Sequence, residues 1–481
     1  MSRIVAVARN MIAEGIRMKI AVIFIVMLVV IVAALPAIMH GDGTLRGRVQ
    51  TFLAYSLGAT AVLLSLLTVF LSCASVAAEL AGRQIFLTVS KPIARWQYLV
   101  GKWLGIAILD ALLLAGAGVG IYAMVAYLKT TAWLNEQDRD ALRYEVLTAR
   151  ASVRPSTPDF AARADAQMER LKEQDRLPQS AFAPTGGWSQ VGQTIRQRIR
   201  DDLSKQWMSC PPLGVREYRF ENMHFDPNEA GLIHLRYKAQ VSRYPPDDIL
   251  RCAWVIGDPT KDGARISRPY LSERADVVRQ YHIVRIPADA IAPDGTLLVR
   301  FENVDRRYSG DFDKMHRTSV SFSGQGDLEV LYEVGSFEAN YLRSLLMILA
   351  QLVLLAAVGV LASSFLSFPV ACLMCMMVYL TAISSGFLQE AIRELAANPS
   401  AFEGDLALRL AVLLKPATTV FLWVVPQISA YNPINDLVDG RLVSWAWLGR
   451  AALWLGAVQT TVAMAAACLI FRRRELAQVI V

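Results

Sequence analysis

The chain has 481 residues, of which 54% are hydrophobic and 19% are charged, and its mean hydropathy is +0.35. A soluble globular protein typically carries about 25% charged residues, and this composition also excludes an intrinsically disordered chain or a small disulfide scaffold. The 49 basic and 42 acidic residues give a net charge of +7. Most short basic clusters lie beside apolar runs, which argues against a nucleic-acid-binding protein. The composition therefore predicts a membrane protein with a substantial soluble part.

Six apolar runs have the length of a membrane-spanning helix, which needs about 20 mostly apolar residues. Before the first run, Ile4, Ala8 and Met11 share one face of the stretch 2–18, which predicts an amphipathic helix on the membrane surface. A long uncharged run after residue 343 is divided in two by Pro369. The predicted spans are Ile20–Ile38, Thr51–Ala78, Trp103–Leu128, Ser344–Phe365, Pro369–Leu388 and Ala451–Phe471.

Lys and Arg flank these runs unevenly, and such residues are enriched on the cytoplasmic side of membrane proteins. The most basic flanks are the N-terminal one, the loop after the second span, and the C-terminal one with Arg472, Arg473 and Arg474. With six spans, both termini are expected in the cytoplasm, and residues 129–343 are expected outside the inner membrane. The first apolar run is longer than the core of a cleaved signal peptide, which favours a retained anchor.

The stretch between the third and fourth spans has an ordinary soluble composition and is predicted to be an extracytoplasmic insert. In its first part, 129–213, apolar residues recur every four positions between Val191 and Trp207, which predicts helices. In its second part, 214–340, residues alternate as in Ile233–Val241, which predicts antiparallel strands in a β-sandwich. The expected fold class is a membrane α-helical bundle of six transmembrane helices with this inserted domain. The predicted parts are 1–128, 129–213, 214–340 and 341–481, with a re-entrant segment over 405–430.

Motifs for nucleotide binding or hydrolysis are absent from the sequence, which contains no G-x-x-x-x-G-K-[ST], H-E-x-x-H or G-x-S-x-G. Its five histidines are scattered without metal-ligand spacing. We therefore expect no catalytic residues, no enzyme activity and no cofactor bound by this chain.

Asp110 is the one acidic residue inside a predicted span, and a charge at this depth is a candidate functional group. The alternative is a structural role, in which Asp110 caps or pairs with a neighbouring helix. In the insert, Cys210 and Cys252 could form a disulfide in an oxidising compartment. In the fifth span, Cys372 and Cys375 face one side of a helix among methionines, which leaves open a Cu(I) site or simple apolar packing.

The loop after the second span combines charged and apolar residues outside the bilayer. Glu79 and Arg83 form an i,i+4 pair on a short predicted helix, which Lys91 and Pro92 end. A second helix leads from Arg95 into the third span. The apolar patch of the short helix, which is suited either to docking in a groove of a partner or to resting on lipid, consists of Ile85, Phe86 and Val89.

This loop resembles the one in ABC-2 type transporter permeases, where the pattern E…R…LL…(S/K)P(I/V)xR…Y…GK follows the second span. The chain end Phe471–Leu476 is similar to the usual C-terminus of that family, and the subgroup it resembles most is the NosY-like permeases. The matching loop residues are Glu79, Arg83, Ser90, Lys91, Pro92, Ile93, Arg95, Tyr98, Gly101 and Lys102. Family members often have Gly-Thr where this chain has Gln84-Ile85, and the large insert is not part of the minimal permease.

The resemblance implies a permease subunit of an ABC-type exporter, which couples ATP hydrolysis by a separate ATPase subunit to transport across the membrane. It also implies a second permease copy as partner, in a homodimer or a heterodimer within the lipid bilayer. The ATPase-coupling residues would be Glu79, Arg83, Ile85, Phe86, Val89, Lys91, Pro92, Arg95, Gly101 and Lys102. Two alternatives remain: a non-transporting anchor or sensor that displays a ligand-binding β-sandwich, and a copper-processing permease.

Overall fold

The structure is a computed structural model, and the chain divides into two compact units. Unit 1 comprises Met1–Ala149 and Gly335–Val481, and unit 2 comprises Arg150–Val334. The residues that the structure describes are 2–38, 44–81, 94–131, 136–177, 181–182, 188–223, 233–245, 247–257, 269–287, 290–292, 294–304, 318–322, 326–397 and 427–473.

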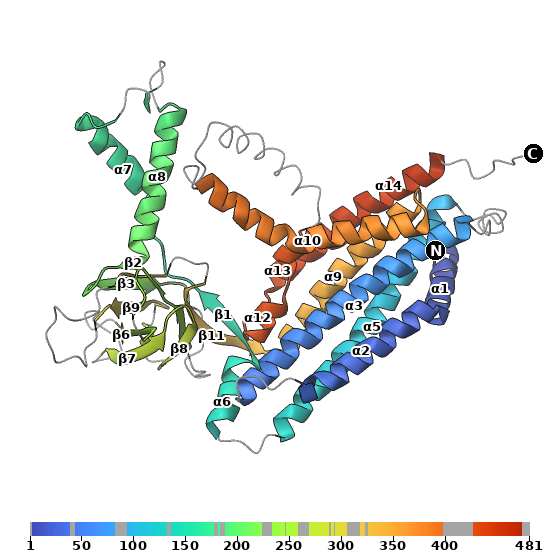
Figure 1. Cartoon of the computed structure of the whole chain (residues 1–481), viewed down its shortest axis with the longest axis horizontal. Helices are drawn as coiled ribbons and strands as arrows, with labels where there is room; N and C mark the ends of the chain where they lie inside the picture. The colour runs from blue at the N-terminus through green and yellow to red at the C-terminus, as the bar shows by residue number, and fades with distance from the viewer. Residues whose placement is uncertain are drawn as a thin grey trace, which may run out of the picture. The chain divides into compact units, whose positions relative to one another are not determined.

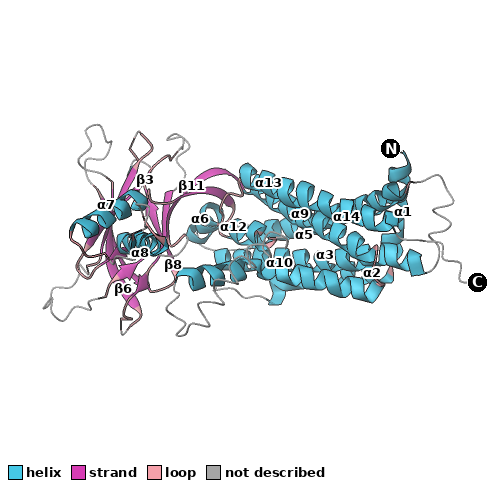
Figure 2. Ribbon diagram, turned by 90° about the horizontal axis from the view of Figure 1, so that it is seen from above, coloured by secondary structure: helices cyan, strands magenta, loops and turns pink. Residues whose placement is uncertain are grey.

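Unit 1 is a bundle of apolar helices in which α3 packs against α2, α5 and α9, as Figures 1 and 2 show. The π-helical segment Ala452–Gln459 joins two helices of the last apolar segment without a break. The helices are α1 (Ser2–Arg17), α2 (Lys19–Ile38), α3 (Leu45–Ala81), α5 (Arg95–Thr131), α6 (Glu136–Glu145), α9 (Phe337–Ser363), α10 (Phe368–Ala397), α12 (Ile434–Val438), α13 (Trp445–Ala451) and α14 (Thr460–Arg473).

Five helical segments among the described residues are long and apolar enough to cross a membrane, which confirms a membrane-helical protein. They correspond to α3, α5, α9, α10 and the continuous stretch Trp445–Arg473. The first predicted span differs, because α2 is bent by 65° from α1 and counts as a sixth span only when the two helices are taken together. The predicted number of six spans is therefore the largest number that the described helices allow.

The break between α9 and α10 lies at the point that Pro369 predicts. Ser364 caps α9, and its backbone N–H contacts the carbonyl oxygen atoms of the last turn. The next helix begins at Phe368, so the proline occupies the first turn of α10, where its missing N–H costs no helical hydrogen bond. The predicted re-entrant segment 405–430 falls mainly on 398–426, which lie outside the described residues.

Unit 2 contains the strands, apart from Thr148 and Ala149 at the start of one and Gly335 and Ser336 at the end of another, and they form two four-stranded sheets and one small sheet. The orders are β1-β11-β4-β8, β3-β9-β6-β7 and β2-β10-β5. Helices α7 (Phe160–Glu173) and α8 (Gln190–Trp207) precede most of the strands. The strands are β1 (Thr148–Val153), β2 (Ser209–Cys210), β3 (Val215–Phe220), β4 (Ile233–Lys238), β5 (Gln240–Val241), β6 (Ile249–Ile256), β7 (Tyr270–Val277), β8 (Tyr281–Ile286), β9 (Leu297–Glu302), β10 (Val320–Ser321) and β11 (Leu328–Ser336).

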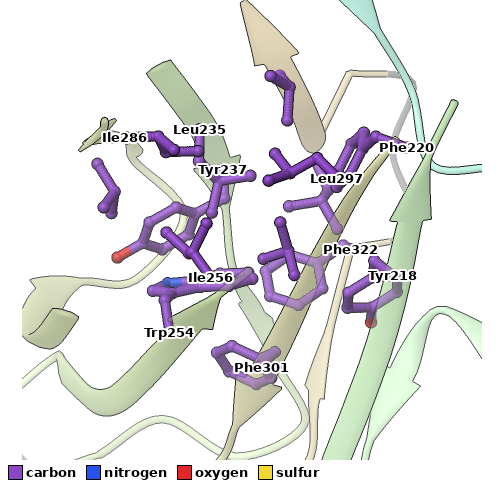
Figure 3. Packing of buried hydrophobic residues seen from close by; sticks show 14 of the residues in the cluster. Tyr218, Phe220, Leu235, Tyr237, Trp254, Ile256, Ile286, Leu297, Phe301 and Phe322 are labelled. Atoms are coloured by element: carbon purple, nitrogen blue, oxygen red, sulfur yellow. The ribbon is translucent and has the colours of Figure 1, made fainter. Parts of the chain in front are cut away.

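Aromatic side chains from both four-stranded sheets share one core in unit 2, which Figure 3 shows from close by. The ring of Trp254 on β6 lies 4.8 Å from that of Tyr237 on β4 and 4.7 Å from that of Phe301 on β9. Phe322 packs against all three rings. This separate β-sheet region confirms the β domain that the alternating pattern predicts.

Two details of unit 2 differ from the prediction. Strand β1 lies within 129–213, where only helices are predicted, because alanines weaken the alternation that marks a strand. Cys210 and Cys252 are both buried free thiols, so the disulfide is not formed. Burial raises the pKa of the Cys210 thiol to about 11 and raises that of Cys252 further, which keeps both groups protonated at neutral pH.

Candidate functional site

A fully buried lysine marks one end of the helical bundle. Lys102 on α5 is 0% exposed, and its Nζ lies 2.6 Å from Oε1 of Glu79 on α3 and 2.9 Å from Oε2 of Glu14 on α1. A buried lysine of this kind is stable only when carboxylates pair with it. The Glu79 side chain is 15% exposed and that of Glu14 is 37% exposed, so Glu79 is the partner that solvent screens less.

Tyr98 completes this arrangement one turn before Lys102 on α5. Its hydroxyl donates a hydrogen bond of 2.6 Å to Oε2 of Glu79, so both oxygen atoms of that carboxylate are engaged. The Nζ of Lys102 also lies 5.9 Å from the centre of the Tyr98 ring, within the range of a cation–π contact. We call Glu14, Glu79, Tyr98 and Lys102 the Lys102 cluster. It joins α1, α3 and α5 through charge-assisted hydrogen bonds.

Arg95 connects the start of α5 to the end of α14. Its Nη1 donates to the backbone carbonyl oxygen atoms of Phe471 and Arg472, each at 3.1 Å. The last carbonyls of a helix lack intrahelical partners and carry partial negative charge, so a guanidinium is a favourable cap there. The rings of Tyr98 and Phe471 also stack, with 6.2 Å between their centres. The first turn of α5 is therefore bound to a fourth helix.

Two glycines let α1 approach α5 closely. Gly101 and Gly105 have the G-x-x-x-G spacing that brings helices together in membranes. A Cβ atom on Gly101 would lie 2.7 Å from Cβ of Val7, and one on Gly105 would lie 2.7 Å from the carbonyl oxygen of Ala8. Ala8 and Met11 are buried in this contact, so part of the apolar face that is predicted to lie on the membrane surface packs against α5.

The structure brings together four of the predicted coupling residues: Glu79, Arg95, Gly101 and Lys102. Glu79 precedes the segment 82–93, and the other three follow it, so they flank the predicted docking loop. The remaining predicted residues, Arg83, Ile85, Phe86, Val89, Lys91 and Pro92, lie outside the described residues.

Glu14 and Gly105 are members of this end of the bundle that the sequence prediction misses. The signal for Glu14 is that it is the only acidic residue in the stretch 1–18, next to the apolar face of an otherwise basic helix. The signal for Gly105 is its spacing of four from Gly101. Neither signal identifies a partner, because α1 and α5 are far apart in the sequence.

Asp110 is separate from the Lys102 cluster. It is 0% exposed, and its Oδ2 lies 3.0 Å from Oγ1 of Thr68 on α3. This contact corresponds to the structural alternative, a pairing with a neighbouring helix.

The intramembrane cysteines gather in an apolar cluster. The Sγ of Cys375 on α10 lies 3.7 Å from that of Cys73 on α3, and Cys372 is buried in the same cluster. Among the described residues, no three or more His, Cys, Asp or Glu side chains are arranged to hold a metal ion. The three buried thiols therefore belong to an apolar contact between α3 and α10.

Comparisons with protein-family models, with curated proteins and with solved structures find no match to this chain.

Proposed function

We propose that this chain is the membrane-spanning permease subunit of an ABC-type exporter, with a separate ATPase subunit that docks on the loop between α3 and α5. The observation that carries the proposal is the position of the Lys102 cluster. Glu79 lies three residues before the segment 82–93, while Tyr98 and Lys102 lie five and nine residues after it, and the Glu79 carboxylate is hydrogen-bonded to both. A displacement of the loop by a docked partner would therefore move α3 and α5 together.

The connections beyond the loop support the same role. Glu14 links the cluster to α1, and Arg95 links the start of α5 to the end of α14. Hydrogen bonds in which one group is charged are stronger than neutral ones, so these links resist separation. A stiff junction of four helices suits the transmission of a rearrangement, because motion at the loop is not absorbed locally.

We further propose an orientation of the chain in the membrane and an assembly of two permease copies. In this proposal both termini and the segment 82–93 lie in the cytoplasm and unit 2 lies outside the inner membrane, an orientation that the basic flanks favour. Six spans in one chain are few for a transport path, so two permease copies would assemble, as the resemblance implies. ATP would be bound and hydrolysed by the partner subunit.

An equal-length replacement of residues 82–93 by Gly and Ser tests the proposal. The tagged full chain, purified from its native membranes, should carry a protein with a Walker motif and should hydrolyse ATP. The loop variant should lose both properties while still inserting into the membrane, because the docking surface is gone. A matched replacement of 306–317 in unit 2 should retain both.

Two results would contradict the proposal: a wild-type chain that purifies without any ATPase, or a loop variant that keeps it. The first result would favour the alternative of an anchor or sensor, since unit 2 has a core of its own and could bind a ligand without nucleotide energy.

A further inference from the structure

Asp110 lies inside the helical bundle, where no solvent reaches its side chain. It is two turns beyond Lys102 on α5, about 12 Å along the axis at roughly 1.5 Å per residue. Oδ1 of its carboxyl has no hydrogen-bond partner among the described residues, and Oδ2 contacts only the hydroxyl of Thr68. An ionised carboxylate in such a position would be an uncompensated buried charge.

The helices that pack against this part of α5 bring few charges near it. The sequence has no charged residue between Arg48 and Glu79 on α3, between Arg343 and the end of α9, or between Arg450 and Arg472 in the last segment. On α1, Glu14 is bonded to Lys102 and Arg17 is exposed, and on α2, which also packs against α5, Lys19 is exposed. Within the described residues, the charged group of α5 before Asp110 is Lys102, whose ammonium is already shared by two carboxylates.

The two short contacts of the Thr68 hydroxyl favour a protonated Asp110. The Oγ1 of Thr68 lies 2.7 Å from the carbonyl oxygen of Leu64 and 3.0 Å from Oδ2 of Asp110. The hydroxyl has one proton, and a carbonyl oxygen has none, so the 2.7 Å contact is favourable only if Thr68 donates to Leu64. The 3.0 Å contact then needs a proton from Asp110, and Oδ1 is the carbonyl oxygen of a neutral acid.

We propose that Asp110 is a proton-binding site of the bundle, held as a neutral carboxylic acid that donates to Thr68 while α3 and α5 are packed together. The ligand is a single proton, which leaves only when separation of the two helices lets water solvate the carboxylate. By linkage, any conformation that hydrates Asp110 binds this proton less tightly. The inference does not depend on an ATPase partner.

The aspartate-to-asparagine change provides a matched control. In Asp110→Asn the side-chain amide can donate to Oγ1 of Thr68 as the acid does, but it has no titratable proton. Its second amide N–H has no acceptor among the described residues of this site, so the variant should unfold a few degrees below the wild type while it keeps the contact between α3 and α5. Valine has nearly the same shape as threonine, so Thr68→Val removes the hydrogen-bond acceptor with little change in packing. The proton of Asp110 should then exchange with solvent faster.

Infrared spectroscopy of the full chain in lipid vesicles at pH 7 tests the proposal. The wild type should show a carbonyl band of a protonated carboxyl group that is absent from Asp110→Asn. After transfer to D2O, exchange of the proton for deuterium should shift this band slowly. In Thr68→Val the exchange should be roughly fivefold faster, which is the rate ratio expected for the loss of one hydrogen bond. The absence of any Asp110-dependent band would overturn the proton assignment. A band that shifts within the mixing time would overturn the role of helix packing in holding the proton.

Discussion

Lys102→Met should destabilise the chain by about 3 kcal/mol, the lower end of the range for removing one partner of a buried ion pair. The variant leaves Glu79 with Tyr98 as its remaining partner in the cluster and leaves Glu14 without its link to α5. The partial exposure of Glu14 keeps the expected loss at the lower end of that range, since water can solvate its carboxylate. The measurement is thermal or denaturant unfolding of the purified chain. If an ATPase co-purifies as proposed, its activity in the complex should also fall.

A second substitution distinguishes a lost ion pair from lost packing. Glu79→Gln removes the buried charge, so the double variant Glu79→Gln, Lys102→Met should be more stable than Lys102→Met alone. Equal stability of wild type and Lys102→Met would contradict the account of the cluster. Strictly additive losses in the double variant would contradict the pairing between the two residues.

Gly105→Ala should destabilise the chain by about 1–3 kcal/mol, the usual cost of forcing an extra carbon into a packed contact. The new Cβ would lie 2.7 Å from the backbone oxygen of Ala8, which cannot move aside unless the whole of α1 shifts. The shift should carry Glu14 away from Lys102 and expose Met11, which is 0% exposed. In a Met11→Cys background, a maleimide should therefore label Gly105→Ala faster than its glycine parent.

The same helix supplies the control. A Cβ atom on Gly116 of α5 meets no atom within 4 Å, so Gly116→Ala should be neutral or should stabilise the helix by up to about 1 kcal/mol through its higher helix propensity. The two substitutions are chemically identical, and only Gly105→Ala is expected to destabilise the chain. Equal effects, or equal maleimide labelling of Met11→Cys, would contradict the close approach of α1 to α5.

Apolar runs predict where the helices cross a membrane, but they do not predict where the helices end. The second predicted span, Thr51–Ala78, becomes α3 from Leu45 to Ala81, and the third, Trp103–Leu128, becomes α5 from Arg95 to Thr131. Hydropathy reports the thickness of an apolar layer, while a helix continues through polar residues for as long as its backbone hydrogen bonds and contacts allow. Within the Lys102 cluster, Glu79 lies in the extension of α3, and Tyr98 and Lys102 lie in that of α5.

The buried state of Lys102 shows what sequence patterns leave out. A lysine at the edge of an apolar run is expected to reach toward water and to set orientation. Its actual environment depends on Glu14, which is 88 positions away in the sequence, and on Glu79, for which the sequence suggests Arg83 as partner. Pairing across helices is set by three-dimensional packing, which spacing along one chain does not encode.

Side-specific labelling of a cysteine in the segment 82–93 tests most directly whether this end of the bundle faces an ATPase in the cytoplasm. A membrane-impermeant maleimide would be applied to sealed vesicles of both orientations that contain Gln84→Cys in a Cys468→Ser background. The other native cysteines are buried. Tyr244→Cys, at a position 51% exposed in unit 2, reports the opposite side. We expect Gln84→Cys to be modified only from the cytoplasmic side and Tyr244→Cys only from the outside, whereas modification of Gln84→Cys from the outside would contradict the proposed function.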